Sequence, residues 1–140
     1  MSPHPKRPGF HFRVRYAECT AHGELGLAGY INYFSEAAAQ ALSERGMDLR
    51  TLTSRSGALR EAGYEVAIQA SPGYDDELEV EVRLHELDER GFTLGFGLQA
   101  ARGGKPLARG AIRYDARSSG PDGACRLPLD LHGLLQEWLV

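Results

Sequence analysis

The sequence has little cysteine and no strong excess of charge of either sign. Its 140 residues include two cysteines, Cys19 and Cys125, too few for a disulfide-rich scaffold or a cysteine-rich zinc site. Sixteen lysine and arginine residues stand against 19 aspartate and glutamate residues, a net charge of −3 that argues against nucleic-acid binding. No metal-ligand spacing, phosphate-binding loop or dinucleotide fingerprint occurs in the sequence. We therefore expect no metal, cofactor or nucleic-acid partner.

Long apolar segments are also missing. No run approaches the ~20 apolar residues of a membrane span, so we expect no membrane association. Residues 1–8 carry proline, histidine, lysine and arginine rather than the apolar core of a secretory signal, which favours a cytoplasmic location. The length suits one domain. We expect a single domain over residues 1–140, with a flexible N-terminus (1–8) and a C-terminal tail (118–140) that carries a possible short helix at 131–139.

The first part of the hydrophobic pattern predicts a strand followed by a long helix. Apolar residues alternate from Phe10 to Tyr16, which is typical of a half-buried strand. After a glycine-rich stretch the spacing becomes helical, and Gly46 follows the apolar stripe where a helix C-cap would lie. The residues of this stripe are Tyr30, Tyr33, Phe34, Ala37, Ala38, Ala41 and Leu42.

The second part of the pattern predicts four more strands. We interpret residues 47–62 as a loop with one or two short helical turns, because they show no clear period. Alternation returns after Gly63, and Gly103-Gly104 is typical of a hairpin turn. Short turns make consecutive strands antiparallel neighbours, which predicts an α+β domain with a curved antiparallel sheet of about five strands around one long central helix. The four later strands are expected at residues 64–70, 78–84, 92–100 and 106–114.

Three short motifs resemble a known family. Residues 15–23 (RYAECTAHG) and 29–37 (GYINYFSEA) resemble the 4-hydroxybenzoyl-CoA thioesterase family of hotdog-fold proteins, and residues 74–80 (YDDELEV) resemble that family's start of a middle strand. The resemblance spans about residues 10–116. It implies the hotdog fold and hydrolysis of an acyl thioester carried by coenzyme A or by an acyl carrier protein. It also implies a homodimer or homotetramer with the site between subunits.

Thioester hydrolysis requires groups that stabilise an oxyanion. The carbonyl oxygen becomes negatively charged in the tetrahedral transition state, so fixed hydrogen-bond donors must point at it. The start of a helix offers unpaired N–H groups and the positive end of the helix dipole. The candidates here are Leu27, Ala28, Gly29 and Tyr30, although the same glycine-rich run could simply turn the chain into the helix.

The family's catalytic aspartate is missing. Thr20 stands at its position, and a threonine hydroxyl could orient a water molecule but cannot act as a general base near neutral pH. Two substitutes remain open. Glu36 resembles an acidic residue that another hotdog branch uses on this helix, and His22 is a histidine, a side chain type suited to general-base work near neutral pH. Either could instead be a solvated surface residue, while Glu18 and Cys19 better suit structural roles.

Charge is distributed unevenly along the chain. Residues 102–126 contain six basic and two acidic residues, whereas residues 75–90 contain two basic and eight acidic ones. Arg90, Arg102 and Lys105 are therefore candidates for binding the phosphates of coenzyme A.

Two alternatives to a general acyl thioesterase stay open: a carrier-protein-directed, polyketide-type thioesterase that lacks the family aspartate, and a catalytically weak acyl-binding hotdog protein.

Overall fold

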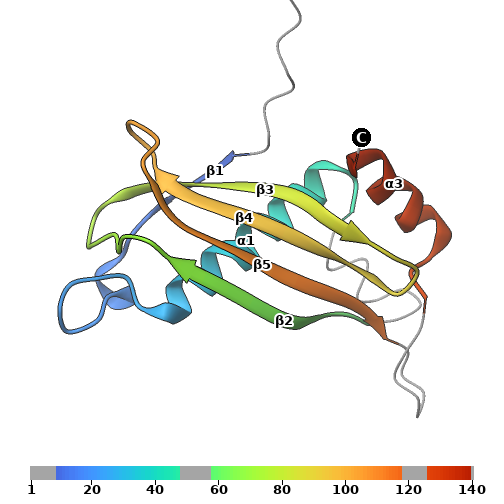
Figure 1. Ribbon diagram of the computed structural model, residues 1–140, viewed down its shortest axis with the longest axis horizontal. Helices are drawn as coiled ribbons and strands as arrows, with labels where there is room; N and C mark the ends of the chain where they lie inside the picture. Colours follow the sequence, from blue (N-terminus) through green and yellow to red (C-terminus); the bar gives the residue numbers. More distant parts are fainter. Residues whose placement is uncertain (1–8, 48–57, 118–125, 140) are drawn as a thin grey trace, which may run out of the picture.

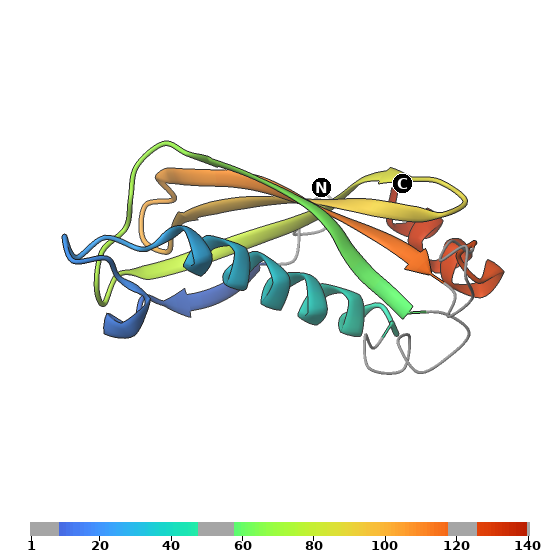
Figure 2. The same cartoon turned by 90° about the horizontal axis from the view of Figure 1, so that it is seen from below.

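The protein consists of a five-stranded antiparallel sheet and a long helix that lies along one face of the sheet (Figures 1 and 2). The computed structural model describes residues 9–47, 58–117 and 126–139. The α+β prediction is therefore confirmed, while the expected flexible residues 1–8 lie outside the described part. The elements are β1 (Gly9–Arg13), the 3-10 turn η1 (Tyr16–Glu18), α1 (Leu27–Glu44), β2 (Ala58–Ile68), β3 (Glu77–Leu87), β4 (Gly91–Ala100), β5 (Pro106–Arg117) and α3 (Leu129–Leu139).

The strand order differs from the predicted one at β2. The sheet runs β1-β3-β4-β5-β2, so β3, β4 and β5 form the expected meander, but β2 pairs with β5 instead of β3. The prediction of four strands that are all neighbours in sequence order is therefore wrong. The connection at residues 69–76 is long enough to cross the end of the sheet, which lets β2 use the open edge of β5.

Two strand boundaries also differ from the predictions. β2 begins at Ala58, so the described end of the expected loop, residues 58–62, is strand; residues 48–57 lie outside the described part. A bulge between Glu61 and Gly63 shifts the register and interrupts the alternation of apolar and polar residues. The sequence pattern therefore did not indicate the first part of this strand. β1 ends at Arg13, and Tyr16 is 80% exposed instead of buried, because the chain leaves the sheet to form η1.

Helix α1 confirms the predicted apolar stripe and its C-terminal cap. Every residue of the stripe is buried against the sheet. Gly46 has φ +83°, its N–H donates to the Ser43 carbonyl at 3.0 Å, and the Met47 N–H donates to the Leu42 carbonyl at 2.8 Å. This pair of bonds is the Schellman motif, which a glycine favours because it has no side chain to clash at positive φ.

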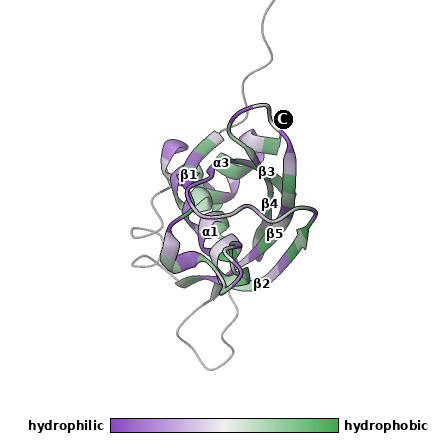
Figure 3. Cartoon of the chain, turned by 90° about the vertical axis from the view of Figure 1, so that its left-hand side faces the viewer, coloured by the Kyte–Doolittle hydropathy of each residue, from purple (hydrophilic) through white to green (hydrophobic). Residues whose placement is uncertain are grey.

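The core lies between α1 and the inner face of the sheet. Apolar and polar residues alternate along the strands (Figure 3), as expected for a sheet with one buried and one solvated face. Phe34 of α1 stacks on Phe96 of β4 with 4.8 Å between ring centroids, and Gly110 of β5 leaves room for the Phe34 ring.

The predicted C-terminal helix is confirmed as α3. It buries Leu131 and Leu135. The Arg45 guanidinium lies 4.1 Å from the centroid of the Trp138 ring, and this cation–π contact joins α3 to the end of α1. No helix within the described ranges is long and apolar enough to cross a membrane.

Candidate active site

The start of helix α1 presents two unpaired backbone donors. Gly26 occupies the N-cap position and offers no side-chain cap. Across residues 9–47, 58–117 and 126–139, the N–H groups of Leu27 and Ala28 have no hydrogen-bond acceptor, and both residues are exposed. The Gly29 N–H instead donates to the Gly26 carbonyl at 2.9 Å. Together with the helix dipole, the Leu27 and Ala28 donors can bind a negatively charged oxygen.

Gly29 and Tyr30 are packed into the structure at this point. A methyl group added to Gly29 would lie 2.4 Å from Leu25 Cδ1, so the absence of a side chain lets Leu25 pack under the first turn. The Tyr30 ring is fully buried, and burial raises the pKa of its hydroxyl. Of the four predicted oxyanion residues, Leu27 and Ala28 therefore have the accessible donors.

The loop before α1 places Thr20 beside the helix start. The Thr20 N–H donates to the Glu24 carbonyl at 2.7 Å, and the Gly26 N–H donates to the Glu18 carbonyl at 2.9 Å, which fold the loop back on itself. A methyl group added to Gly26 would lie 3.8 Å from Thr20 Cγ2. The exposed Thr20 hydroxyl accepts a hydrogen bond from the His22 N–H at 3.2 Å.

His22 is exposed in the same loop, two residues after Thr20. The loop is tied to the β2–β3 connection, because the Leu25 N–H donates to the Pro72 carbonyl at 2.8 Å and the Tyr74 N–H donates to the Gly23 carbonyl at 3.4 Å. The structure thus places Thr20 beside the helix start and His22 in the same loop.

Glu36 lies farther along α1. Its exposed side chain lines a groove of about 570 Å³ between α1 and β1, together with Asn32 and Tyr33. Ala28 and Glu36 are about 12 Å apart along the helix axis at the usual rise per residue. Cα–Cβ bonds tilt toward the helix N-terminus, so the Glu36 side chain leans toward the helix start without spanning this interval.

Glu18 links two walls of this groove through hydrogen bonds. Its Oε1 accepts hydrogen bonds from the Tyr33 hydroxyl at 2.5 Å and from the Arg15 N–H at 2.8 Å. Burial, followed by the hydrogen bond to Glu18, raises the pKa of Tyr33. Glu18 therefore connects η1 to α1.

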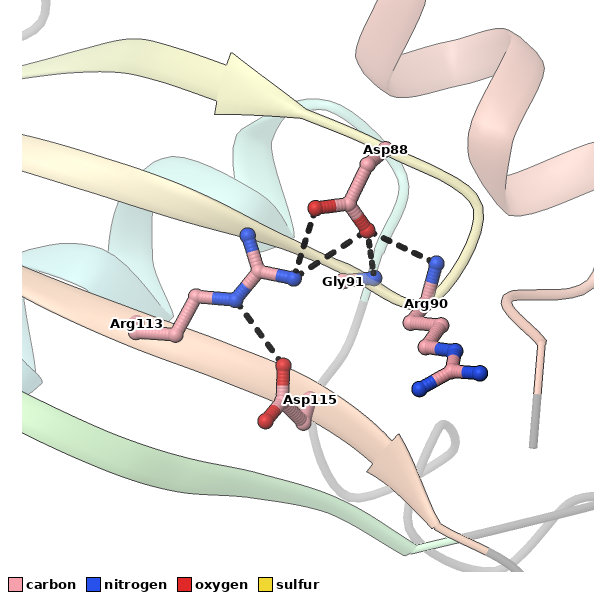
Figure 4. A network of polar contacts seen from close by, with 5 residues as sticks. All are labelled: Asp88, Arg90, Gly91, Arg113 and Asp115. Atoms are coloured by element: carbon pink, nitrogen blue, oxygen red, sulfur yellow. Dashed lines mark hydrogen bonds and ion pairs between the residues drawn. The ribbon is translucent and has the colours of Figure 1, made fainter. Parts of the chain in front are cut away.

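The three predicted phosphate-binding residues do not lie together. Arg102 and Lys105 border the β4–β5 turn and line a cavity of about 500 Å³ with Ser71 and Pro72. Arg90 lies in the β3–β4 turn at the opposite end of the sheet, about 30 Å away at the usual rise of a strand. There the Arg90 N–H donates to Asp88, which also pairs with Arg113 (Figure 4). The structure therefore separates Arg90 from the other two cations.

Comparisons with proteins of known structure identify the fold. No model of a protein family matches the chain, and no curated protein matches it in sequence. A solved structure of a 1,4-dihydroxy-2-naphthoyl-CoA thioesterase from Synechocystis matches with TM-score 0.84 at 17% identity, over 92% of this chain and 95% of that one. The chain has the hotdog fold.

Two further solved structures match this hotdog domain with TM-scores of 0.80 or above. A 4-hydroxybenzoyl-CoA thioesterase mutant complexed with 4-hydroxybenzoyl-CoA matches with TM-score 0.80 at 17% identity, over 91% of this chain and 97% of that one. A dynemicin thioesterase matches with TM-score 0.82 at 19% identity, over 96% and 99%. At these identities the similarity establishes the fold, and the activities belong to the named proteins.

The hotdog domain also has a polar cluster that the sequence motifs did not indicate. Glu61 of β2 accepts hydrogen bonds from the Ser35 hydroxyl of α1, at 2.9 Å, and from the Tyr64 hydroxyl. Tyr114 lies opposite Glu61 in the β2–β5 register, and its buried hydroxyl has no partner in the described part of the chain. Burial, followed by the charge of Glu61, raises the pKa of Tyr114. The bulge next to Glu61 interrupts the alternation of apolar residues, so the sequence pattern did not place Glu61 on the inner face of the sheet.

Proposed function

We propose that this protein is an acyl thioesterase that hydrolyses acyl-CoA or acyl-carrier-protein thioesters. The observation that carries the proposal is the uncapped start of α1, where the N–H groups of two exposed residues, Leu27 and Ala28, have no acceptor in the described part of the chain. The hotdog thioesterases with the same fold support this assignment. The reaction needs no metal or redox cofactor.

The Leu27 and Ala28 N–H groups would stabilise the oxyanion. They donate to the thioester carbonyl oxygen and bind it more strongly as negative charge develops. Water loses a proton to a general base and attacks the carbonyl carbon, and the tetrahedral intermediate collapses with cleavage of the C–S bond. The thiolate that leaves takes up a proton, and the products are a carboxylic acid and a free thiol.

Glu36 and His22 are the two candidates for the general base, with Thr20 orienting the water. His22 shares the loop with Thr20, while Glu36 lines the groove about two helical turns farther along α1. Turnover of Glu36→Gln and His22→Gln distinguishes them, because loss of a general base typically lowers the rate about 100-fold or more. Glu44→Gln, an exposed carboxylate at the far end of α1, is the matched control. A fall of less than tenfold would exclude the residue from this role.

The activity itself is tested by thiol release from aromatic, short-chain and long-chain acyl-CoA thioesters and from the same acyl groups on a carrier protein. Cleavage of the carrier-protein thioesters alone would select the polyketide-type enzyme, for which the Thr20 substitution and the similarity to a dynemicin thioesterase are the supporting observations. Binding of acyl thioesters without any thiol release would instead identify an acyl-binding protein.

We infer that Arg102 and Lys105 bind phosphate groups of coenzyme A. Both are exposed and line the cavity beside Ser71 and Pro72. Pro72 also accepts the hydrogen bond from Leu25 in the loop before α1, so this cavity adjoins the helix start. Arg102→Ala and Lys105→Ala are expected to raise KM for a CoA thioester, and the effect should shrink as salt screens the charges.

We also infer that two copies of the chain join along β2. This strand pairs with β5 on one side and is the edge of the sheet on the other. Tyr64 and Ile68 are 48% and 45% exposed there, unusual for the edge of a sheet in water. Ile68→Lys is expected to convert a homodimer or homotetramer into smaller species in light scattering. An unchanged mass would exclude this edge as the interface.

A further inference from the structure

Two tyrosine rings lie exposed beside the loop that leads into α1. Tyr16, in η1, is 80% exposed and Tyr74, in the β2–β3 connection, is 60% exposed. Their rings meet edge to face, with 6.0 Å between centroids and 83° between planes. Aromatic rings contribute most when they are buried, so two adjacent exposed rings are typical of a surface that binds something.

Backbone hydrogen bonds fix both tyrosines relative to the candidate active site. The Cys19 N–H donates to the Tyr16 carbonyl at 3.1 Å, directly before Thr20. The Tyr74 N–H donates to the Gly23 carbonyl at 3.4 Å, within the same loop. Both rings are therefore anchored to the loop that carries Thr20 and leads into α1.

The rings border one of two hollows that share a wall. Tyr16 and Tyr74 line the groove of about 570 Å³ that also contains Glu36. Arg13 and Asp75 line both this groove and the cavity of about 500 Å³. They form an ion pair with 3.1 Å between Arg13 Nη1 and Asp75 Oδ1. A single extended ligand can therefore reach from the tyrosine rings across this pair into the cavity.

Of the four arginine and lysine residues that line these hollows, one is engaged in ion pairs within the described residues. Arg13 pairs with Asp75 and Glu77, and this environment raises the pKa of its guanidinium, foremost through the hydrogen bond to Asp75. Asp76 accepts a hydrogen bond from the Gly73 N–H at 2.8 Å. Three cations that line the hollows have no acidic side chain within 4.0 Å anywhere in the described ranges: Arg15, Arg102 and Lys105. Within the same ranges, the acids of the two linings that have no cationic side chain within 4.0 Å are Glu18, Glu36 and Asp76.

We propose that Tyr16 and Tyr74 form a platform for the adenine base of coenzyme A, while the neighbouring cations bind its phosphates. A purine stacks favourably on an exposed aromatic ring, and arginine is suited to phosphate recognition. An acyl group on a carrier protein is attached through a phosphopantetheine arm that has no adenine. The platform therefore favours coenzyme A as the acyl carrier, an inference that rests on the proposed thioesterase function.

The test compares two thioesters of one acyl group, a CoA thioester and the truncated N-acetylcysteamine thioester. Tyr16→Ala and Tyr74→Ala are each expected to raise KM for the CoA thioester about 5- to 150-fold, the range for loss of one base stack, with little change in kcat. Neither variant should alter KM for the truncated substrate. Tyr16→Phe and Tyr74→Phe keep the rings and should behave as wild type, as should Leu129→Ala at a remote exposed position.

Direct binding separates this inference from the proposed function. Adenosine 3′,5′-bisphosphate carries the base without an acyl group, and calorimetry should show its affinity falling in both alanine variants by the same factor as the rise in KM. If wild type hydrolyses neither thioester, the proposed function fails, but this titration still decides whether the platform binds adenine. Unchanged bisphosphate affinity in the variants would overturn the platform, and so would an equal rise in KM with both thioesters.

Discussion

Gly110→Ala tests how closely α1 must approach the sheet. Gly110 lies on the inner face of β5, where an added methyl group would lie 2.5 Å from the Glu65 carbonyl oxygen and 2.6 Å from Phe34 Cε2. Neither neighbour can move freely. Glu65 belongs to β2, which is hydrogen-bonded to β5, and the Phe34 ring is stacked on Phe96. The substitution therefore forces the helix and the sheet apart.

The expected cost follows from two opposing effects. Overpacking a filled core costs about 1–3 kcal/mol, and the upper part of that range applies because two immobile neighbours are involved. Replacing glycine by alanine also reduces the conformational entropy of the unfolded chain, which stabilises the folded state by about 0.4–1 kcal/mol. The free energy of unfolding should fall by about 2 kcal/mol, which corresponds to a decrease of roughly 6 °C in the melting temperature.

Urea denaturation provides the measurement, with Gly97→Ala as the matched control. Gly97 lies in the neighbouring strand β4, and an added methyl group there would meet no heavy atom within 4 Å. Gly110→Ala should lower the urea midpoint by about 1 M with an unchanged m-value, while Gly97→Ala should leave the midpoint equal or slightly higher. Equal midpoints for the two variants would refute the close approach of Phe34 to β5.

Two further predictions concern stability. Burial opposes ionisation of Asp88, but the hydrogen bonds from the Arg90 N–H and from Arg113 outweigh it and lower the pKa of Asp88. The resulting stabilisation, at most about 1 kcal/mol for so exposed a pair, is present above the ordinary pKa and is lost as pH falls through the folded-state pKa. Unfolding free energies from pH 7 to pH 2.5 should therefore converge for wild type and Asp88→Asn at low pH, and a constant difference would contradict this. In thermal melts, Gly46→Ala should destabilise by about 1 kcal/mol because φ is +83°, whereas Gly133→Ala within α3 should be neutral or stabilising.

Several parts of the candidate site could be anticipated from the sequence because they are local. Thr20, His22 and the start of α1 belong to one short stretch of chain, so a motif can place them near one another. Glu36 is different, since its distance from the helix start follows from helix geometry, but the groove it lines depends on β1. The Glu61 cluster joins β2, α1 and β5, and no local pattern connects those three elements.

The sequence by itself determined the elements whose pattern is local: the buried stripe of α1, its glycine cap at Gly46, and the alternation of β3, β4 and β5. Hydrophobic periodicity records which face of an element is buried, so it needs no knowledge of the neighbours. Only the tertiary structure decided that β2 pairs with β5 and that Tyr16 meets Tyr74. Those contacts depend on which sheet edge is still open and on where the loops cross it, and every strand of the chain contributes to that outcome.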